Sequence, residues 1–200
     1  MSNVPNVLLA AGSSSRMGTP KQLLPWNGKT LIEHQIETLL ETKKEAYVVL
    51  GAFSEQIQPL VKRYPVQTIV YEDWSMGMGN TIAHAINQLQ AKSNPPKGVL
   101  FALSDQPLVT SAHYKLMHAT FQSGREQIIV SVSESGWEGV PVLFDYCYFQ
   151  YLKKLNGEFG AKQILKKLDR PMIKIEAGSL LVDMDTPEAY TRLYKKFNLQ

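Results

Sequence analysis

The sequence predicts an α/β layered fold built on a mostly parallel sheet. Short β-branched or aliphatic runs alternate with segments of helical spacing, the order expected of parallel strands joined by helices. Continuous apolar runs such as Val99–Leu103 are typical of strands covered on both faces. The 200 residues, 44% of them hydrophobic, are enough for one domain with a buried core. Because no repeat or linker divides the chain, we expect a single domain over residues 1–200.

The strands are expected where β-branched and aliphatic residues gather between turn-forming residues. Such runs occupy Val7–Ala11, Ala46–Leu50, Val66–Tyr71, Val99–Leu103, Ile128–Val132, Val140–Phe144, Met172–Ile175 and Leu180–Met184.

Helices are expected between several of these runs. From Leu31 to Leu40 the apolar residues fall on one helical face, and Thr30 with Glu33 forms a capping box. Asn80–Leu89 repeats the apolar spacing.

A last helix is expected to begin in the segment Asp185-Thr186-Pro187-Glu188. Asp185 is predicted as its N-cap, followed by a proline that the first turn tolerates and a glutamate three residues after the cap.

Composition excludes several classes of protein. The net charge of +3 is too weak to predict nucleic-acid binding. The single cysteine, Cys147, forms no intrachain disulfide and no zinc ribbon. No apolar run approaches the length that spans a bilayer, and the N-terminus lacks the basic end of a signal peptide. We therefore expect a cytoplasmic protein with neither a nucleic-acid nor a membrane partner.

The loop after the first predicted strand has the composition of a phosphate-binding loop. Ligands of α/β sheets bind outside the carboxyl ends of the strands. Gly12 and the serines after it allow backbone amides to approach an anion, and Arg16 and Lys21 add two cations. An ordinary glycine-serine turn with two solvated basic residues is the alternative.

Two better-known phosphate motifs are not met. A P-loop ending at Gly28-Lys29-Thr30 needs a glycine where Leu23 stands. A dinucleotide fingerprint starting at Gly12 needs a glycine where Ser14 stands.

Three aspartates are candidates for a magnesium site. Asp105 ends a strongly apolar strand, and Asp183 and Asp185 follow at the end of the last predicted strand. Mg²⁺ typically takes one or two carboxylates together with substrate phosphates. Each aspartate is also suited to capping a helix or turn, and Asp183 is expected to be the freer of the later two.

The segment Met76–Asn80 is a further candidate for ligand binding. It opens a helix at about Asn80, and a helix N-terminus offers free amides to an anion or to a base carbonyl. A helix-start loop with its methionines packed inward is an equally weighted alternative.

An ordered set of motifs resembles one enzyme family. Leu9–Lys21 looks like the signature LAAGxSxRMGxxK of the molybdopterin nucleotidyltransferases. Asp105-Gln106-Pro107 is similar to the family's DQP, and Gly139–Phe144 to its GHPVLF. Gly157–Lys162 resembles GDxGAR, and Asp183–Glu188 resembles DIDTPED. The full set is most similar to the molybdenum cofactor cytidylyltransferase branch. It departs from the family at Val140, where the family has His.

The resemblance implies a single-domain, Rossmann-like α/β nucleotidyltransferase fold of three layers around a mostly parallel, mixed sheet. It implies transfer of CMP from CTP to the terminal phosphate of molybdopterin, with Mg²⁺ as cofactor and a molybdenum hydroxylase as client. Arg16, Lys21 and Asp105 are the implied catalytic residues, and Asp105 with Asp183 or Asp185 the implied metal ligands. The implied nucleotide-binding residues are Leu9, Ala10, Ala11, Gly12, Ser13, Ser14, Ser15, Arg16, Met17, Gly18, Lys21, Gly77, Asn80, Thr81, Ser104 and Asp105.

Other functions stay open at this point. Within the transferases, a GTP-using guanylyltransferase or a sugar- or isoprenoid-phosphate cytidylyltransferase shares the first motif. A dinucleotide-dependent oxidoreductase and a non-catalytic cofactor-delivery protein are the rivals outside that class.

Overall fold

The computed structural model of the chain describes residues 3–161, 165 and 171–198. None of the helices in this part of the chain is long and apolar enough to cross a membrane. The strands of the main sheet are β1 (Asn6–Ala10), β4 (Ala46–Leu50), β5 (Gln67–Val70), β6 (Gly98–Leu103), β7 (Ile128–Ser133), β8 (Glu138–Asp145) and β9 (Ile173–Gly178). The helices are α1 (Leu31–Leu40), α2 (Ser54–Val61), α3 (Met78–Gln90), α4 (Ser111–Thr120), α5 (Phe149–Leu152) and α7 (Pro187–Asn198).

Seven strands form one mixed sheet in the order β5-β4-β1-β6-β8-β7-β9. β8 pairs antiparallel with both of its neighbours, whereas the other pairs are parallel. The predicted α/β class with a mostly parallel, mixed sheet is therefore confirmed. A second, two-stranded sheet consists of β2 (Pro25–Trp26) and β3 (Lys29–Thr30).

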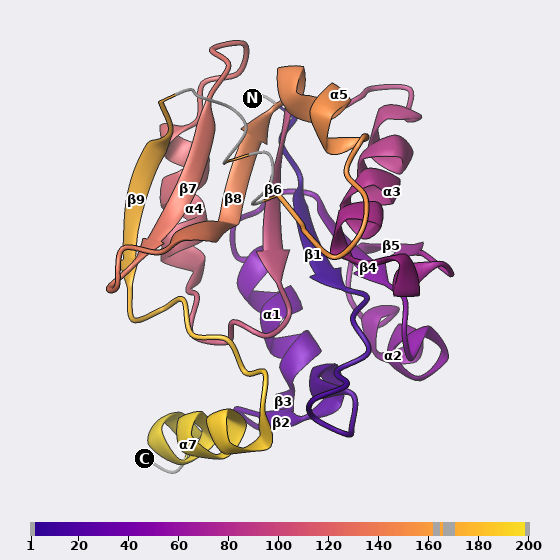
Figure 1. Cartoon of the computed structure of the whole chain (residues 1–200), viewed down its shortest axis with the longest axis vertical. Helices are drawn as coiled ribbons and strands as arrows, with labels where there is room; N and C mark the ends of the chain where they lie inside the picture. Colours follow the sequence, from indigo (N-terminus) through magenta and orange to yellow (C-terminus); the bar gives the residue numbers. More distant parts are fainter. Residues whose placement is uncertain (1–2, 162–164, 166–170, 199–200) are drawn as a thin grey trace.

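Helices cover both faces of the sheet, giving three layers (Figure 1). Successive side chains of a strand point to opposite faces. In β1, Val7 and Leu9 accordingly pack in the core beneath α3 and α5, while Leu8 and Ala10 pack in the core beneath α1, α2 and α4. This double coverage explains why β1 and β4 are fully buried and, apart from Asn6, consist of apolar and aromatic residues.

The helix predictions from capping and spacing are close to the structure. α1 begins directly after Thr30, whose backbone N–H donates to Glu33 Oε2 at 3.0 Å, as half of the predicted capping box requires. α3 begins at Met78, two residues earlier than expected.

The predicted cap of the last helix is wrong by one residue. α7 begins at Pro187, and Thr186 Oγ1 accepts a hydrogen bond from the N–H of Ala189 at 3.2 Å. Thr186 therefore supplies the capping oxygen, and Asp185 is left available for other contacts.

The predicted strand at Leu180–Met184 is also wrong. The last strand ends at Gly178, which has a left-handed φ of 55°, and Leu180 N–H closes a turn on Ala177 O at 3.0 Å. The apolar residues that suggest a strand are instead packed as a loop against two core clusters. Met184 N–H donates to the backbone oxygen of Asp105 at 2.9 Å, so this loop crosses the carboxyl edge of the sheet.

The C-terminal helix α7 lies below that edge (Figure 1). A third apolar cluster packs this helix against the rest of the molecule. Trp26, Leu31, Met184 and Leu193 are buried in it. The cluster joins the small sheet, the start of α1 and α7, and so fixes the loop that precedes α7.

Candidate active site

The loop after β1 folds back on itself through a tight turn at Ser14. Ser14 has a left-handed φ of 53°, and Met17 N–H donates to Ser14 O at 2.8 Å. Ser14 Oγ accepts from the backbone N–H of Lys21 at 3.1 Å, which ties the two ends of the loop together. In the described part of the chain, the backbone N–H groups of Gly12 to Arg16 donate to no other group. They are therefore available to an anion.

A buried glutamine braces this loop from beneath. Gln22 Nε2 donates to the carbonyl oxygens of Ala10 and Gly12, both at 3.1 Å, and the residue is fully buried. Sequence reasoning missed Gln22. Its only signal is its position beside Lys21, because an isolated polar residue does not reveal that it will be buried.

Lys21 lies between two of the predicted metal ligands. Its ammonium group contacts Asp105 Oδ2 and lies 3.0 Å from Asp185 Oδ1. Arg16 holds the other oxygen of Asp185 at 2.8 Å from the surface side. The side chains of Lys21 and Asp105 are each only 14% exposed, whereas that of Arg16 is 68% exposed. Residues from both ends of the chain thus form one charged cluster.

The ionisation of this cluster follows from its contacts. Burial alone would lower the pKa of Lys21, but the charges and hydrogen bonds of Asp105 and Asp185 outweigh it and raise that pKa. Burial would raise the pKa of Asp185, yet Lys21 and Arg16 hold it below its usual range. The lysine therefore stays protonated, and Asp185 stays ionised.

Asp183 has a different environment. It accepts a hydrogen bond from Gln106 Nε2 at 2.9 Å. Lost hydration and then the charge of Asp105 raise the pKa of Asp183 to about 6, although the residue as a whole is exposed. The sequence predicts that Asp183 is the freer of the two because it predicts Asp185 as the cap of the last helix, which Asp185 is not. Asp185 is instead the aspartate that shares Lys21 with Asp105.

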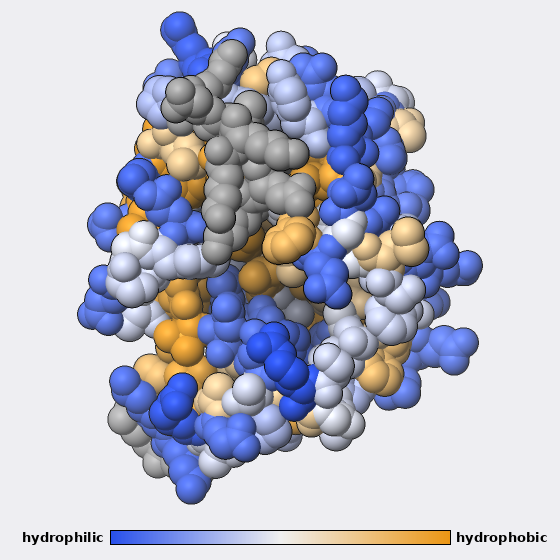
Figure 2. Space-filling model, viewed as in Figure 1, coloured by the Kyte–Doolittle hydropathy of each residue, from blue (hydrophilic) through white to orange (hydrophobic). Residues whose placement is uncertain are grey.

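A cavity of about 350 Å³ lies where β1 and β6 end. Figure 2 shows this face of the molecule hollowed near its centre, with hydrophilic side chains gathered below the hollow. Ten predicted nucleotide-binding residues line the cavity: Leu9, Ala10, Ala11, Gly12, Ser13, Lys21, Gly77, Thr81, Ser104 and Asp105. The structure places six of the predicted residues outside this lining: Ser14, Ser15, Arg16, Met17, Gly18 and Asn80. Sequence reasoning missed Gln22, Trp74, Ser75 and Leu103. It identified the segments Met76–Asn80 and Gly157–Lys162 but did not single out Met78 or Glu158 within them.

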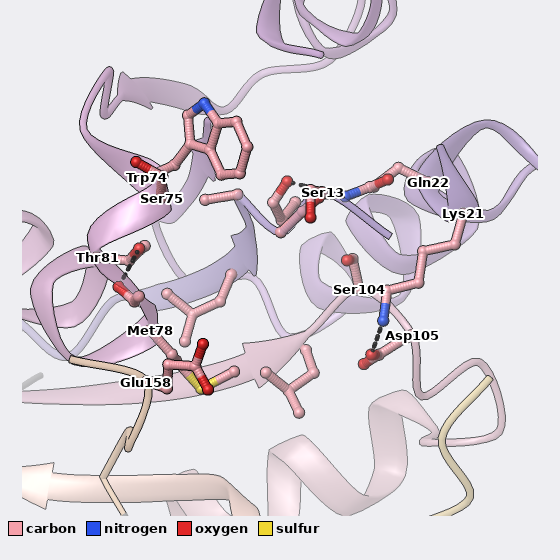
Figure 3. A pocket seen from close by; sticks show the side chains of 16 residues that line it. Ser13, Lys21, Gln22, Trp74, Ser75, Met78, Thr81, Ser104, Asp105 and Glu158 are labelled. Atoms are coloured by element: carbon pink, nitrogen blue, oxygen red, sulfur yellow. Dashed lines mark hydrogen bonds and ion pairs between the residues drawn. The ribbon is translucent and has the colours of Figure 1, made fainter. Parts of the chain in front are cut away.

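The two ends of the cavity differ in chemistry (Figure 3). Lys21 and Asp105 point toward one another at one end, beside the amide-rich loop. Trp74, Met78 and Glu158 lie at the other end. The cavity therefore joins a charged end that suits phosphates to an end lined by aromatic, thioether and carboxylate groups.

Glu158 reaches the cavity because its loop is fixed on the start of α3. Gly79 N–H donates to Gly157 O at 2.9 Å, and Gly157 N–H donates to Asn80 Oδ1 at 2.7 Å. Two of the polar groups expected to meet a ligand at this helix start therefore hold the loop instead. Lys162, at the end of the same motif, lies outside the described residues.

The charged end has features of a divalent-metal site. Asp105 Oδ1 is buried and has no hydrogen-bond partner. Hard divalent cations prefer such carboxylate oxygens. Asp185 lies on the other side of the Lys21 ammonium group. Among the described residues no group of three or more His, Cys, Asp or Glu side chains forms a complete cage. The residues therefore fit an ion whose remaining ligands are water and phosphate oxygens.

Comparison with known proteins decides the family. The family described as "MobA-like NTP transferase domain" matches residues 6–172, most of the chain. The protein belongs to the MobA-like NTP transferase family. As a nucleotidyltransferase of this family it has relatives with several names. It is 39% identical to nicotine blue oxidoreductase of Paenarthrobacter nicotinovorans, over 95% of this chain and 96% of that one.

A second relative bears the name that the sequence motifs suggest. The molybdenum cofactor cytidylyltransferase of Escherichia coli (strain K12) is 23% identical over 98% of both chains.

Solved structures share the fold. Rv0371c from Mycobacterium tuberculosis H37Rv superposes with a TM-score of 0.84 at 25% identity, over 96% of this chain and 97% of that one. A manganese complex of the same protein matches with a TM-score of 0.78 at 23% identity, over 96% of this chain and 98% of that one.

Proposed function

We propose that this nucleotidyltransferase moves CMP from CTP to the terminal phosphate of molybdopterin and releases pyrophosphate. The observation that carries the proposal is the meeting of the Gly12 loop, Lys21 and Asp105 at one end of a single cavity. That end is suited to a triphosphate, because free amides and an ammonium group lie beside a carboxylate that fits a divalent ion. The ordered motifs and the cytidylyltransferase relative support cytidine and molybdopterin as the partners.

The reaction we propose is an in-line displacement. An oxygen of the acceptor phosphate forms a bond to the α-phosphorus of CTP as the bond between the α-phosphorus and the bridging oxygen breaks, and pyrophosphate leaves. Catalysis of this kind depends on positioning and charge neutralisation. The amides of the Gly12 loop, Lys21 and Arg16 would hold the leaving phosphates.

No protein base is required in this scheme. A phosphate monoester has its second pKa at about 6 and is largely ionised near neutral pH.

Mg²⁺ is the proposed cofactor, with Asp105 and Asp185 as the residues that would hold it. When bound, it would neutralise phosphate charge and polarise the phosphoryl oxygens. A manganese complex of a protein of the same fold supports a divalent ion in general. Asp183, with its pKa raised to about 6 and its bond to Gln106, is better suited to positioning the Asp105 segment.

The test is pyrophosphate release from four nucleoside triphosphates against several phosphate acceptors, with and without Mg²⁺. We expect release with CTP and molybdopterin, dependent on Mg²⁺. The Asp105→Ala variant should lose the Mg²⁺-dependent turnover while keeping its thermal unfolding transition. Retained turnover in that variant would remove Asp105 from the metal site.

An oxidoreductase function is the second candidate, because a relative that is 39% identical bears that name. A hydride-transfer enzyme needs a nicotinamide or flavin cofactor. Oxidation of NADH or NADPH in the presence of an electron acceptor, without pyrophosphate release from any triphosphate, would favour this function over the proposed one.

A further inference from the structure

Lys21 occupies the space between the two carboxylates that would hold a divalent ion. Its ammonium group contacts Asp105 and lies 3.0 Å from Asp185, and the side chain is largely buried. Asp105 therefore has one oxygen taken by an ammonium ion and one buried oxygen without a partner.

Lys21 and Arg16 place two positive charges against the carboxylates of Asp105 and Asp185, and Asp183 adds a third carboxylate nearby. A divalent ion that reached Asp105 in this arrangement would stand beside the ammonium ion, and the two cations would repel each other at short range. Divalent-ion binding therefore requires the ammonium group to move.

The phosphate oxygens of a bound triphosphate would offer the Lys21 ammonium group an alternative partner to Asp105. Lys21 lines the cavity together with Gly12 and Ser13, the loop whose amides are free for an anion. A flexible side chain that already faces the cavity can exchange a carboxylate for a phosphate without movement of the backbone.

We propose that the Lys21 ammonium group takes the cation position between Asp105 and Asp185, so that a divalent ion binds well only when a triphosphate draws the ammonium group away. The inference rests on the proposed function for the assignment of the divalent ion to Asp105. In this proposal Lys21 couples the binding of the divalent ion to the binding of the triphosphate. Because such coupling is reciprocal, a divalent ion must also strengthen triphosphate binding.

The test measures Mn²⁺ binding to the protein alone, from the electron paramagnetic resonance signal of free Mn²⁺. Lys21→Met removes the ammonium group and keeps a side chain of similar length. We expect Mn²⁺ to bind this variant at least about 10-fold more tightly than wild type, a change of about 1.4 kcal/mol. The Mn²⁺-induced rise in melting temperature should also be larger in the variant than in wild type.

Arg16→Met is the matched control. It changes the net charge by the same amount but removes a largely exposed cation that contacts only Asp185 in the cluster. Its gain in Mn²⁺ affinity should be clearly smaller than that of Lys21→Met, because Arg16 is largely exposed and does not contact Asp105.

Three results would overturn the inference. They are an unchanged affinity in Lys21→Met, an equal increase in both variants, and tight Mn²⁺ binding to the wild-type protein without nucleotide. Lys21→Gln replaces the methionine variant if the latter does not fold. All of these measurements report Mn²⁺ binding and none depends on turnover. A failed pyrophosphate assay would therefore reject the proposed function, whereas only the Mn²⁺ measurements would reject the role of Lys21.

Discussion

Gly12 lies just after the end of β1 and lines the cavity. A Cβ atom added there would meet no atom within 4 Å, and the residue does not have a left-handed φ. The fold therefore does not require glycine at this position. What requires it, under the proposed function, is the close approach of a phosphate to the backbone amides.

Gly12→Ala separates these two requirements. We expect the melting temperature to stay within about 1 °C of wild type, because the added methyl group meets open space. The KM for the triphosphate should rise about 10-fold or more, equivalent to about 1.4 kcal/mol. Ser93→Ala, at an exposed position that does not line the cavity, is the control and should leave KM unchanged. An unchanged KM in Gly12→Ala would place the phosphates elsewhere.

At the scale of elements, the start of α3 and the loop that carries Glu158 fit together backbone to backbone. Gly77 has a φ of 102°, and a Cβ there would stand 2.4 Å from Gly157 O. A Cβ at Gly79 would stand 2.7 Å from Asn156 O. These glycines allow the close approach that places Glu158 in the cavity.

Gly79→Ala should push that loop away from α3. Overpacking against backbone atoms is expected to lower the free energy of unfolding by about 1–3 kcal/mol, measured by urea denaturation. Because Glu158 is displaced with the loop, the kinetic constants for the acceptor should also change. Gly12→Ala, the same substitution in open space, is the control. Unaltered stability in Gly79→Ala would show that the loop and α3 are not held together by this contact.

Helix α4 packs two histidines toward the sheet. His118 Nε2 and Asn6 Oδ1 are 2.8 Å apart, and burial, with a smaller effect from Lys44, lowers the pKa of His118 to about 4. Burial also lowers the pKa of His113, whose Nε2 lies 2.8 Å from Ser131 Oγ. Both rings are therefore neutral in the folded protein near neutral pH.

The pH dependence of stability follows from the sign of this shift. A histidine whose folded pKa is lowered leaves stability intact above its unfolded pKa of about 6.5 and reduces it as the pH falls toward 4. For His118 the loss should reach about 2 kcal/mol at about pH 5 relative to about pH 7.5. His118→Gln, which keeps a donor for Asn6, should flatten the urea-denaturation profile over this range. An equally steep profile in the variant would assign the loss to other groups.

At the scale of the whole molecule, Asp185 lies in a segment held between the sheet edge and the C-terminal helix. The chain returns from β9 across the sheet edge, is bonded to Asp105 through Met184, and then enters α7. Leu193 of α7 is buried against Trp26 and Leu31, residues far away in the sequence. Packing below the edge therefore holds one side of the charged cluster.

Leu193→Ala tests that coupling. Removal of a buried leucine side chain should lower the free energy of unfolding by about 2–4 kcal/mol. A higher Mg²⁺ concentration should also be needed for half-maximal turnover, because Asp185 loses its support. Arg192→Ala, on the exposed side of the same helix, is the control and should change neither quantity. Destabilisation without any change in Mg²⁺ dependence would separate α7 from the site.

The sequence by itself determined the α/β class, most of the strands and the loop that follows β1. These depend on local periodicity and on glycine and serine chemistry, which are visible within a few residues. It also indicated Lys21 and Asp105 as site residues from their positions after strands.

Only the tertiary structure decided which groups meet. Leu180–Met184 has the sequence of a strand but forms a packed loop. An apolar run predicts that a segment is buried, but it does not specify whether the backbone pairs with a neighbouring strand. The pairing of Lys21 with Asp185, the brace from Gln22 and the place of Glu158 all depend on contacts between residues far apart in the sequence. Such contacts are fixed by how the layers pack, and no local pattern encodes them.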